Sequence, residues 1–395
     1  LDTSFESVLM KEISKLPDLE KQKNLRSFFD DLTKKDGITS TVRNWIITNE
    51  EVIHWADKML GRLKNHGTHA GGILITQGPV YDYIPVTRGG KEVVTAFRES
   101  DGSAKDLSKL GLLKLDVLGV ATLNIVYDSV RQIKEQLNID IKDDITYINL
   151  ENPDLYKLVR EGKLYSVFQL DGGARPLVER IQPSKFDDIV AVSALNRPGP
   201  LETFGPIYTK WKKHFENGEE YKCEEDKEIY PRLDFMRKVT RDSYYCLIYQ
   251  EQFMFMEIEA AGFNLGEADN FRRAIAWRED HPKYHTVKKY YDTLEEKMLE
   301  KGYSKDDVTY FVEYCRKFGG YSFNASHAVA YGYIGAQCLY LKCYYPAYFY
   351  ANTANVEKHE EYSNVVTTAM SEGVTVLPPS IINSKFNWTV ENEGK

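Results

Sequence analysis

The sequence predicts an α+β protein that is mostly helical, because two hydrophobic periods occur in different parts of the chain. Three short stretches, at Ile73–Thr76, Val93–Phe97 and Leu113–Leu118, have the period of two that is typical of strands. From Thr122 onward apolar residues recur at helical spacing, and Gly or Pro interrupts the pattern. We therefore expect a helical N-terminal piece, one small sheet and a large helical region.

The composition is that of an ordinary soluble globular protein. The chain has 395 residues, enough for two or three domains, of which 42% are hydrophobic and 28% charged. No apolar run approaches the roughly 18 to 20 residues of a membrane span. The net charge of −8 argues against nonspecific coating of nucleic acid but allows a local basic groove.

The five cysteines are odd in number, and no two of them form a CxxC pair. This pattern predicts neither a disulfide framework nor a structural zinc site, and it favours a reducing, cytoplasmic setting. The chain begins at Leu1 without a signal-peptide pattern, so we expect it to be a piece of a longer protein. The cysteines are Cys223, Cys246, Cys315, Cys338 and Cys343.

Residues 1 to about 65 predict amphipathic helices that are separated by Pro17 and by Asp36-Gly37. A last helix over Val52–Lys64 carries Arg62 and Lys64 at its end, which could contact a phosphate backbone or remain solvated. The apolar stripes of the earlier helices consist of Phe5, Val8, Leu9, Ile13, Leu25, Phe28, Phe29 and Leu32.

The first predicted strand is preceded by Asn65-His66-Gly67-Thr68-His69-Ala70-Gly71-Gly72. This stretch resembles the histidine motif of subtilisin-type serine proteases, but the chain has neither the serine turn nor the aspartate turn that a catalytic triad needs. Zinc binding by His66 and His69 lacks a third ligand at a recognisable spacing. We therefore interpret the stretch as a tight turn into the sheet.

The last predicted strand contains Lys114-Leu115-Asp116-Val117-Leu118-Gly119, and helical spacing follows it. A carboxylate at a strand end, just before a helix, is well placed to hold a metal ion beside a phosphate. An aspartate at this position can equally be an edge residue or a cap. Two further stretches, Ile141–Ile148 and Val374–Leu377, are candidates for short strands.

Four stretches of the helical region carry polar residues that predict a grip on a triphosphate. A helix start offers free N–H groups and a positive dipole end to an anion. Arginines supply delocalised charge, and a histidine can donate to a phosphate oxygen. The stretches are the turn Val167–Gly173, the Pro-Gly-Pro break with Arg197, a predicted helix start with Arg272 and Arg273, and a glycine-rich loop with Asn324, Ser326 and His327.

These motifs identify the chain as similar to the C-family bacterial replicative DNA polymerases, the alpha subunit of DNA polymerase III. They occur in the family's order over roughly residues 65 to 383. The matching stretches are His69-Ala70-Gly71-Gly72, Lys114 to Gly119, Val167-Phe168-Gln169-Leu170, Gln182-Pro183, Phe186-Asp187-Asp188-Ile189, Arg197 to Leu201, Tyr249-Gln250-Glu251-Gln252, Gly266-Glu267-Ala268-Asp269, Arg272-Arg273, Phe323-Asn324, Ser326-His327, Leu341-Lys342 and Tyr345-Pro346.

The resemblance implies an incomplete nucleotidyltransferase palm related to that of family X polymerases, with a helical thumb and large helical fingers. Residues 1–66 would be the thumb, 67–121 the second part of the palm and 122–395 the fingers. Asp116 matches the third catalytic carboxylate, a ligand of two Mg²⁺ ions, and Lys114 faces the same site. The residues that match the surface for the incoming nucleotide are Arg272, Arg273, Asn324, Ser326 and His327. The alternative for Arg273 is a structural ion pair with a nearby acid such as Asp269, four residues before it on the helix.

The sequence departs from the family pattern in its motifs and in its domains. The Pro-Asp-x-Asp-x-Asp-Phe motif with the paired catalytic aspartates is not found, and neither are the PHP, clamp-binding and OB domains. Ala325 and Ala276-Trp277-Arg278 stand where the family usually has lysines. The chain therefore resembles a fragment of a divergent polymerase of phage or bacterial origin.

We expect a template-directed DNA polymerase that is inactive as an isolated chain. Its partners would be primer–template DNA, a deoxynucleoside triphosphate, the remainder of the polymerase and a sliding clamp, without a membrane. Two alternatives remain open, namely a non-catalytic DNA- or nucleotide-binding subunit and an assembly piece of a split replicase.

Overall fold

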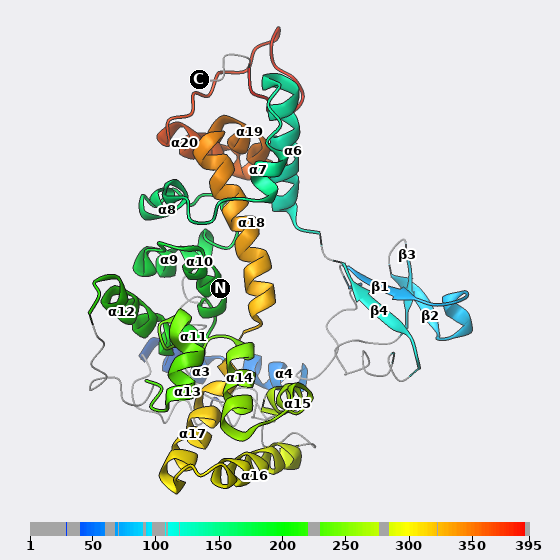
Figure 1. Cartoon of the computed structure of the whole chain (residues 1–395). Helices are drawn as coiled ribbons and strands as arrows, with labels where there is room; N and C mark the ends of the chain where they lie inside the picture. Colours follow the sequence, from blue (N-terminus) through cyan, green and yellow to red (C-terminus); the bar gives the residue numbers. More distant parts are fainter. Residues whose placement is uncertain are drawn as a thin grey trace. The chain divides into compact units, whose positions relative to one another are not determined.

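The chain divides into two compact units, Leu1–Gly119 and Val120–Lys395, which are drawn in Figure 1. The boundary lies beside the predicted border at 121/122, while the assignment to thumb, palm and fingers stays a prediction. The computed structural model describes residues 29, 40–59, 68, 69, 71–89, 92–96, 107, 110–117, 119–219, 230–275, 284–321 and 323–391. The predicted helical stripes before residue 40, apart from Phe29, lie outside these residues, as do His66 and Cys223.

The described residues of the first unit form two helices, α3 (Ser40–Thr48) and α4 (Glu50–Met59), a short 3-10 helix and four strands. Helix α4 has Glu50 and Glu51 in its first turn and Lys58 in its last turn, an order that suits the helix dipole. The 3-10 helix and the strands are η2 (Val80–Asp82), β1 (Gly72–Ile75), β2 (Val86–Gly89), β3 (Glu92–Thr95) and β4 (Leu113–Asp116).

The strands form two separate antiparallel pairs, β1–β4 and β2–β3, so the prediction of one sheet was wrong. The three predicted strands are present, but β3 pairs with β2, a strand that the sequence reading missed. The reason is proximity along the chain, because only two positions separate the end of β2 from the start of β3, whereas β4 pairs with β1 across a longer stretch of sequence.

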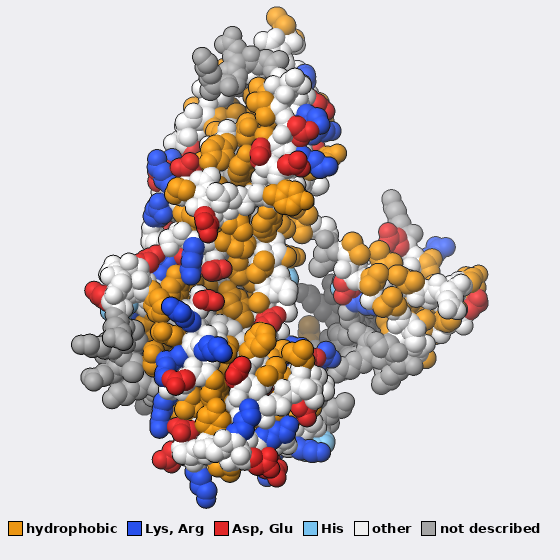
Figure 2. Space-filling view, viewed as in Figure 1, with side chains coloured by type: hydrophobic (Ala, Val, Ile, Leu, Met, Phe, Trp, Pro, Cys, Tyr) orange, Lys and Arg blue, Asp and Glu red, His pale blue; other side chains and the backbone are white. Residues whose placement is uncertain are grey.

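The β1–β4 ribbon has two unlike faces. Antiparallel pairing sets Ile73 opposite Leu115 and Ile75 opposite Leu113, so these four apolar side chains share one face. All four are exposed, and Figure 2 shows hydrophobic side chains gathered over this part of the chain. The opposite face carries the alternate residues of both strands, including Asp116.

The second unit is helical, and the described part of the chain therefore confirms a mostly helical α+β class. The long helix α18 packs against α6, α8, α10 and α19 (Figure 1). The described α-helices of the second unit are α6 (Ala121–Leu137), α7 (Lys142–Thr146), α8 (Pro153–Arg160), α9 (Arg175–Ile181), α10 (Phe186–Leu195), α11 (Pro200–Thr203), α12 (Gly205–Glu216), α13 (Asp234–Thr240), α14 (Gln250–Ala261), α15 (Leu265–Ile275), α16 (Tyr284–Glu300), α17 (Lys305–Phe318), α18 (Ala325–Tyr344), α19 (Pro346–Val356) and α20 (Tyr362–Ser371).

Short 3-10 helices lie between these α-helices. They are η4 (Gly172–Ala174), η5 (Arg241–Ser243), η6 (Gly319–Tyr321) and η7 (His359–Glu361). Close approach to α18 requires glycine at Gly335, where a Cβ atom would lie 2.9 Å from the carbonyl oxygen of Phe168. The turn predicted at Val167–Gly173 thus packs directly against α18.

The two extra candidate strands are absent from the described structure. Ile141–Ile148 contains helix α7 instead, because Ile141, Ile145 and Ile148 follow the i, i+4, i+7 spacing of a helix and all three are buried. Val374–Leu377 has no regular structure, and the N–H of Val374 donates to the carbonyl of Ala369 at the end of α20.

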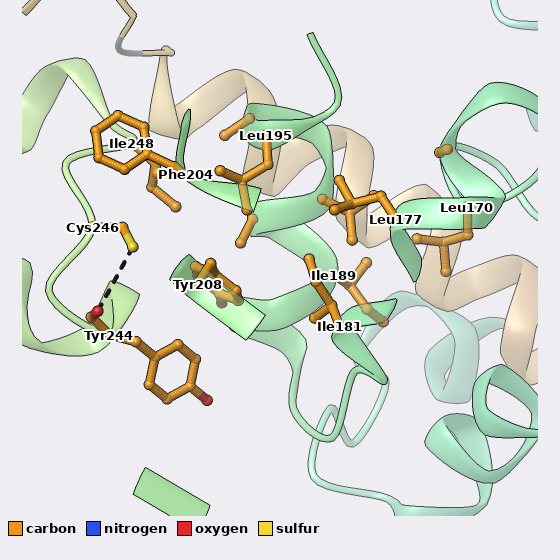
Figure 3. Packing of buried hydrophobic residues seen from close by; sticks show 14 of the residues in the cluster. Leu170, Leu177, Ile181, Ile189, Leu195, Phe204, Tyr208, Tyr244, Cys246 and Ile248 are labelled. Carbon is orange, nitrogen blue, oxygen red and sulfur yellow. Dashed lines mark hydrogen bonds between the residues drawn. The ribbon is translucent and has the colours of Figure 1, made fainter. Parts of the chain in front are cut away.

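A buried ion pair lies beside the main hydrophobic core of the second unit. The core side chains of α9 and α10 meet Phe204 and Tyr208, as Figure 3 shows. Asp188 and Lys212 lie next to these side chains, and both are almost fully buried. They form an ion pair in which Asp188 Oδ2 is 3.5 Å from Lys212 Nζ. Asp188 also accepts hydrogen bonds from the Tyr208 hydroxyl and the backbone N–H of Ser184. The carboxylate thereby ties α10 to α12.

Within the described residues no helix has both the length and the apolar character that crossing a bilayer requires. The four described cysteines, Cys246, Cys315, Cys338 and Cys343, are free thiols.

Candidate functional site

Asp116 is the last residue of β4 and lies opposite Gly72 of β1. Lys114, two residues earlier, projects to the same face, and its Nζ atom lies 3.0 Å from Asp116 Oδ1. The Asp116 side chain is 52% exposed, whereas that of Lys114 is 20% exposed. The pair therefore presents an accessible carboxylate with a cation beside it.

His69 lies next to this pair, with Nδ1 3.9 Å from Asp116 Oδ1. The same nitrogen accepts a hydrogen bond from the Gly71 N–H at 3.2 Å, as expected for a residue that shapes the turn into β1. A Cβ atom on Gly72 would lie 2.9 Å from His69 Nδ1 and 3.0 Å from Lys114 Cε. Glycine at this position therefore leaves room for both side chains beside Asp116.

The ribbon does not gather a set of metal ligands by itself. Over the described residues there is no group of three or more His, Cys, Asp or Glu side chains that could hold a metal ion. Asp116 can supply one carboxylate ligand.

In the second unit, a helix begins within the stretch Ala261–Ala274 as predicted, but the placement of Arg272 and Arg273 at the positive end of this helix was wrong. Helix α15 begins at Leu265, and both arginines lie in its last turn. The Asn264 side chain accepts from the Glu267 N–H, while the Glu267 carboxylate accepts from the Asn264 N–H. This reciprocal capping fixes the helix start well before the arginines, and its Asn-x-x-Glu spacing is readable in the sequence.

Both arginines bind the same carboxylate, Asp269. Arg272 donates from Nε and Nη2 to Asp269 Oδ1 at 3.1 and 2.8 Å, and Arg273 Nη2 lies 2.6 Å from Asp269 Oδ2. These contacts, chiefly the hydrogen bond from Arg272, lower the pKa of Asp269. The Arg272 side chain is 23% exposed and that of Arg273 is 65% exposed, so Arg273 is the more accessible cation.

Helix α18 begins at Ala325 and is capped by Asn324, whose side chain accepts from the His327 N–H at 2.8 Å. A carboxylate from another helix also lies here. Glu251, in the first turn of α14, accepts from Asn324 Nδ2 at 3.0 Å and from the Ala325 N–H at 2.9 Å. Part of the predicted anion-binding helix start is therefore occupied by a side chain of the protein.

A short parallel bridge between Tyr249 and Phe323 joins the starts of α14 and α18. The N–H of Gln250 donates to the Phe323 carbonyl, and the N–H of Phe323 donates to the Ile248 carbonyl, both at 2.8 Å. The Gln250 side chain accepts from Arg272 Nη1 at 3.0 Å. The bridge therefore links the arginine of α15 to the loop that precedes α18.

Two further predicted residues flank the Phe323 ring. The Arg197 guanidinium lies 4.7 Å from the ring centroid, and burial lowers the pKa of Arg197. The His327 ring meets the edge of Phe323 and stacks on Tyr331, with centroids 4.2 Å apart. Ser326 is exposed in the first turn of the same helix.

The structure thus brings Arg197, Arg272, Asn324 and His327 around one bridge, with Arg273 and Ser326 on the adjoining turns. We call Arg197, Gln250, Glu251, Arg272, Phe323, Asn324 and His327 the bridge cluster. Gln250, Glu251 and Phe323 were not predicted as site residues, although they lie in the motifs Tyr249-Gln250-Glu251-Gln252 and Phe323-Asn324 that match the family. Their role became visible only through contacts across more than seventy positions of the chain.

Comparison with known proteins places two family models in tandem on the chain. The model described as the bacterial DNA polymerase III alpha NTPase domain matches residues 4–119. The model described as the bacterial DNA polymerase III alpha subunit finger domain matches residues 122–302.

Individual relatives are similar over most of the chain. The DNA polymerase III alpha subunit of Bacillus subtilis is 34% identical over 350 residues, which are 87% of this chain and 29% of the relative. That of Aquifex aeolicus is 35% identical over 350 residues, 88% of this chain and 28% of the relative. That of Staphylococcus aureus is 31% identical over 344 residues, 85% of this chain and 30% of the relative. The chain therefore spans less than a third of the length of these relatives.

Proposed function

Because the chain belongs to the family of bacterial DNA polymerase III alpha subunits, we propose that it forms part of a template-directed DNA polymerase. The reaction would transfer a nucleotidyl group from a deoxynucleoside triphosphate to the 3′-hydroxyl of a primer. The observation that carries the nucleotide-binding part is the bridge cluster, in which residues predicted to meet the triphosphate lie together although the sequence separates them widely.

Asp116 would supply one ligand to the Mg²⁺ ions that the family resemblance implies, and such ions stabilise charge on the reacting phosphate. Its half-exposed carboxylate fits this role, and Lys114 balances its charge while no ion is bound. Among the described residues no group of three or more candidate ligands surrounds such an ion. No step of the proposal therefore depends on ions held by this chain alone.

Arg273 is the residue we expect to contact the triphosphate most directly. It is largely exposed and has a single carboxylate contact, whereas Arg272 donates three hydrogen bonds within the protein. Arg272 would then hold Asp269, and through it Arg273, in position. His327 and Ser326 would add donors from the first turn of α18.

Primer and template would be held mainly through their phosphates, so their binding should weaken as salt is raised. The remainder of the polymerase and a sliding clamp are proposed as protein partners. A second candidate function is a catalytically silent nucleotide- or DNA-binding subunit of a split replicase. Under this alternative the paired catalytic aspartates would lie on another polypeptide.

We expect no measurable primer extension by the isolated chain, because one carboxylate cannot hold two catalytic ions. Extension should appear when the chain is mixed with, or fused to, a polypeptide that carries the missing aspartates; we call this the completed polymerase. The control is the same polypeptide without this chain. Extension by the isolated chain, in a preparation free of other polymerases, would show that it holds the remaining ligands. If the completed polymerase is also inactive, the silent-subunit function is favoured.

Replacing Arg273 by Ala should lower kcat/KM for the nucleotide about tenfold in the completed polymerase, because a charge that contacts the triphosphate is lost. Arg272→Ala and His327→Ala should act in the same direction, and affinity for DNA should change little. Steady-state kinetics and DNA binding by anisotropy measure both quantities. Arg180→Ala is a matched control, because Arg180 is an exposed arginine in the last turn of α9. Weakened DNA binding with unchanged nucleotide kinetics would contradict the assignment.

A further inference from the structure

The first three residues of α14 are Gln250, Glu251 and Gln252, and the side chain of each accepts hydrogen bonds from a different segment of the chain. Gln252 accepts from the N–H groups of Ile248 and Tyr249 and so caps its own helix. Gln250 and Glu251 instead bind residues outside α14. The local needs of the helix start are therefore met by Gln252, and the other two side chains serve contacts with α15 and α18.

Glu251 fixes the start of α18 by two contacts. Its Oε1 atom accepts from Asn324 Nδ2, and its Oε2 atom accepts from the Ala325 N–H. The first contact orients the Asn324 amide so that its oxygen faces the His327 N–H. Hydrogen bonds to an ionised group are stronger than those between neutral groups. Glu251 therefore sets both the rotamer of Asn324 and the position of the first turn of α18.

Gln250 fixes the arginine on the other side of the bridge. Its Oε1 atom accepts from Arg272 Nη1, while Asp269 accepts from Nε and Nη2 of the same guanidinium. The guanidinium is thus held by partners from two helices. The Gln250 N–H also donates to the Phe323 carbonyl. Gln250 therefore binds both Arg272 and the loop that precedes α18.

We propose that Gln250 and Glu251 are positioning residues for nucleotide recognition. Glu251 holds Asn324 and the first turn of α18. Gln250 holds Arg272, which in turn holds Asp269 and Arg273, so that Arg273 and the start of α18 face a nucleotide as one surface. This assignment rests on the proposed function. Neither residue needs to touch the nucleotide, and the negative charge of Glu251 is satisfied by donors of the protein.

The test is binding of a fluorescent deoxyadenosine triphosphate, labelled with a methylanthraniloyl group, to the full 395-residue chain in the presence of Mg²⁺. Glu251→Ala should raise the Kd about tenfold, and Glu251→Gln should raise it less, because the amide oxygen can still accept from the Ala325 N–H. Gln250→Met should also raise the Kd. Glu259→Ala is the matched control, because Glu259 is an exposed glutamate of α14, and it should leave the Kd unchanged.

A coupling measurement separates positioning from a general loss of stability. If Glu251 acts through Asn324, the double variant Glu251→Ala/Asn324→Ala should lose less affinity than the sum of the two single losses. Urea unfolding of each variant shows whether it remains folded. Additive losses, or an unchanged Kd for Glu251→Ala, would overturn the assignment and leave the proposed function standing.

Two other results have distinct meanings. Tighter nucleotide binding by both Glu251 variants would show that the carboxylate competes with phosphate for the start of α18, and the positioning role would be wrong. Failure of the unchanged chain to bind the nucleotide would overturn the nucleotide-binding part of the proposed function, and the present assignment with it.

Discussion

Replacing Asp116 by Asn should lower primer extension by the completed polymerase at least about a thousandfold, equivalent to about 4 kcal/mol on the barrier. The amide is nearly isosteric with the carboxylate, so the β1–β4 pairing should persist. It has no negative charge for a divalent ion, and Lys114 Nζ loses the carboxylate that lies 3.0 Å away. Activity should therefore be lost through chemistry and not through unfolding.

Single-turnover extension measures the loss, and circular dichroism checks that the variant is folded. Titration of the completed polymerase with Mn²⁺ gives a readout besides activity, since Asp116→Asn should weaken metal binding. Asp82→Asn, at an exposed aspartate of the same unit, is the control and should retain full activity. A loss of less than about tenfold, or 1.4 kcal/mol, would count against Asp116 as a catalytic metal ligand.

Replacing Asp188 by Ala should destabilise the second unit by about 3–5 kcal/mol. The carboxylate is fully buried, and its removal takes the closest acceptor from the Tyr208 hydroxyl and the Ser184 N–H. Lys212 keeps its contact with Glu216 but loses its buried counter-charge. Burial, the largest cause that raises the pKa of Tyr208, persists in the variant, so the buried hydroxyl still requires a hydrogen-bond acceptor.

Urea unfolding followed by circular dichroism measures this effect. The neighbouring residue offers a matched control, because the Asp187 side chain is 63% exposed and only pairs with Lys185 at 3.6 Å. Asp187→Ala should cost less than about 1 kcal/mol, as exposed ion pairs usually do. Equal losses for the two variants would show that the buried ion pair does not hold α10 and α12 together.

The contrast between these adjacent aspartates shows where the sequence stops being informative. Asp187 and Asp188 are the same residue type, and both lie in the first turn of α10, directly after Phe186. Which of them is buried depends on α12, whose Tyr208 and Lys212 lie 20 and 24 residues beyond Asp188 and contact that aspartate. A family motif marked the pair but could not assign their separate roles.

The sequence by itself determined the features that depend on local periods. A period of two placed Lys114 and Asp116 on one face of a strand, and the helical spacing after Thr122 predicted the helical second unit. Helix starts with a capping side chain, such as Asn324 before α18, are equally local. The start of α15 at Asn264-x-x-Glu267 was also readable, and overlooking it misplaced the arginines.

Only the tertiary structure decided which segments meet. Strand pairing into two ribbons and the occupation of the α18 start by Glu251 join residues whose contact no local period specifies. The ion pairs of Asp269 with Arg272 and Arg273 differ, because they follow the i, i+3 and i, i+4 spacing of a helix. A carboxylate has the same intrinsic chemistry at positions 116, 188, 251 and 269. The packing of distant elements sets the burial and the partners of each carboxylate. As a result Asp116 is an exposed candidate for a metal ligand, Asp188 is a buried structural anion, and Glu251 caps another helix.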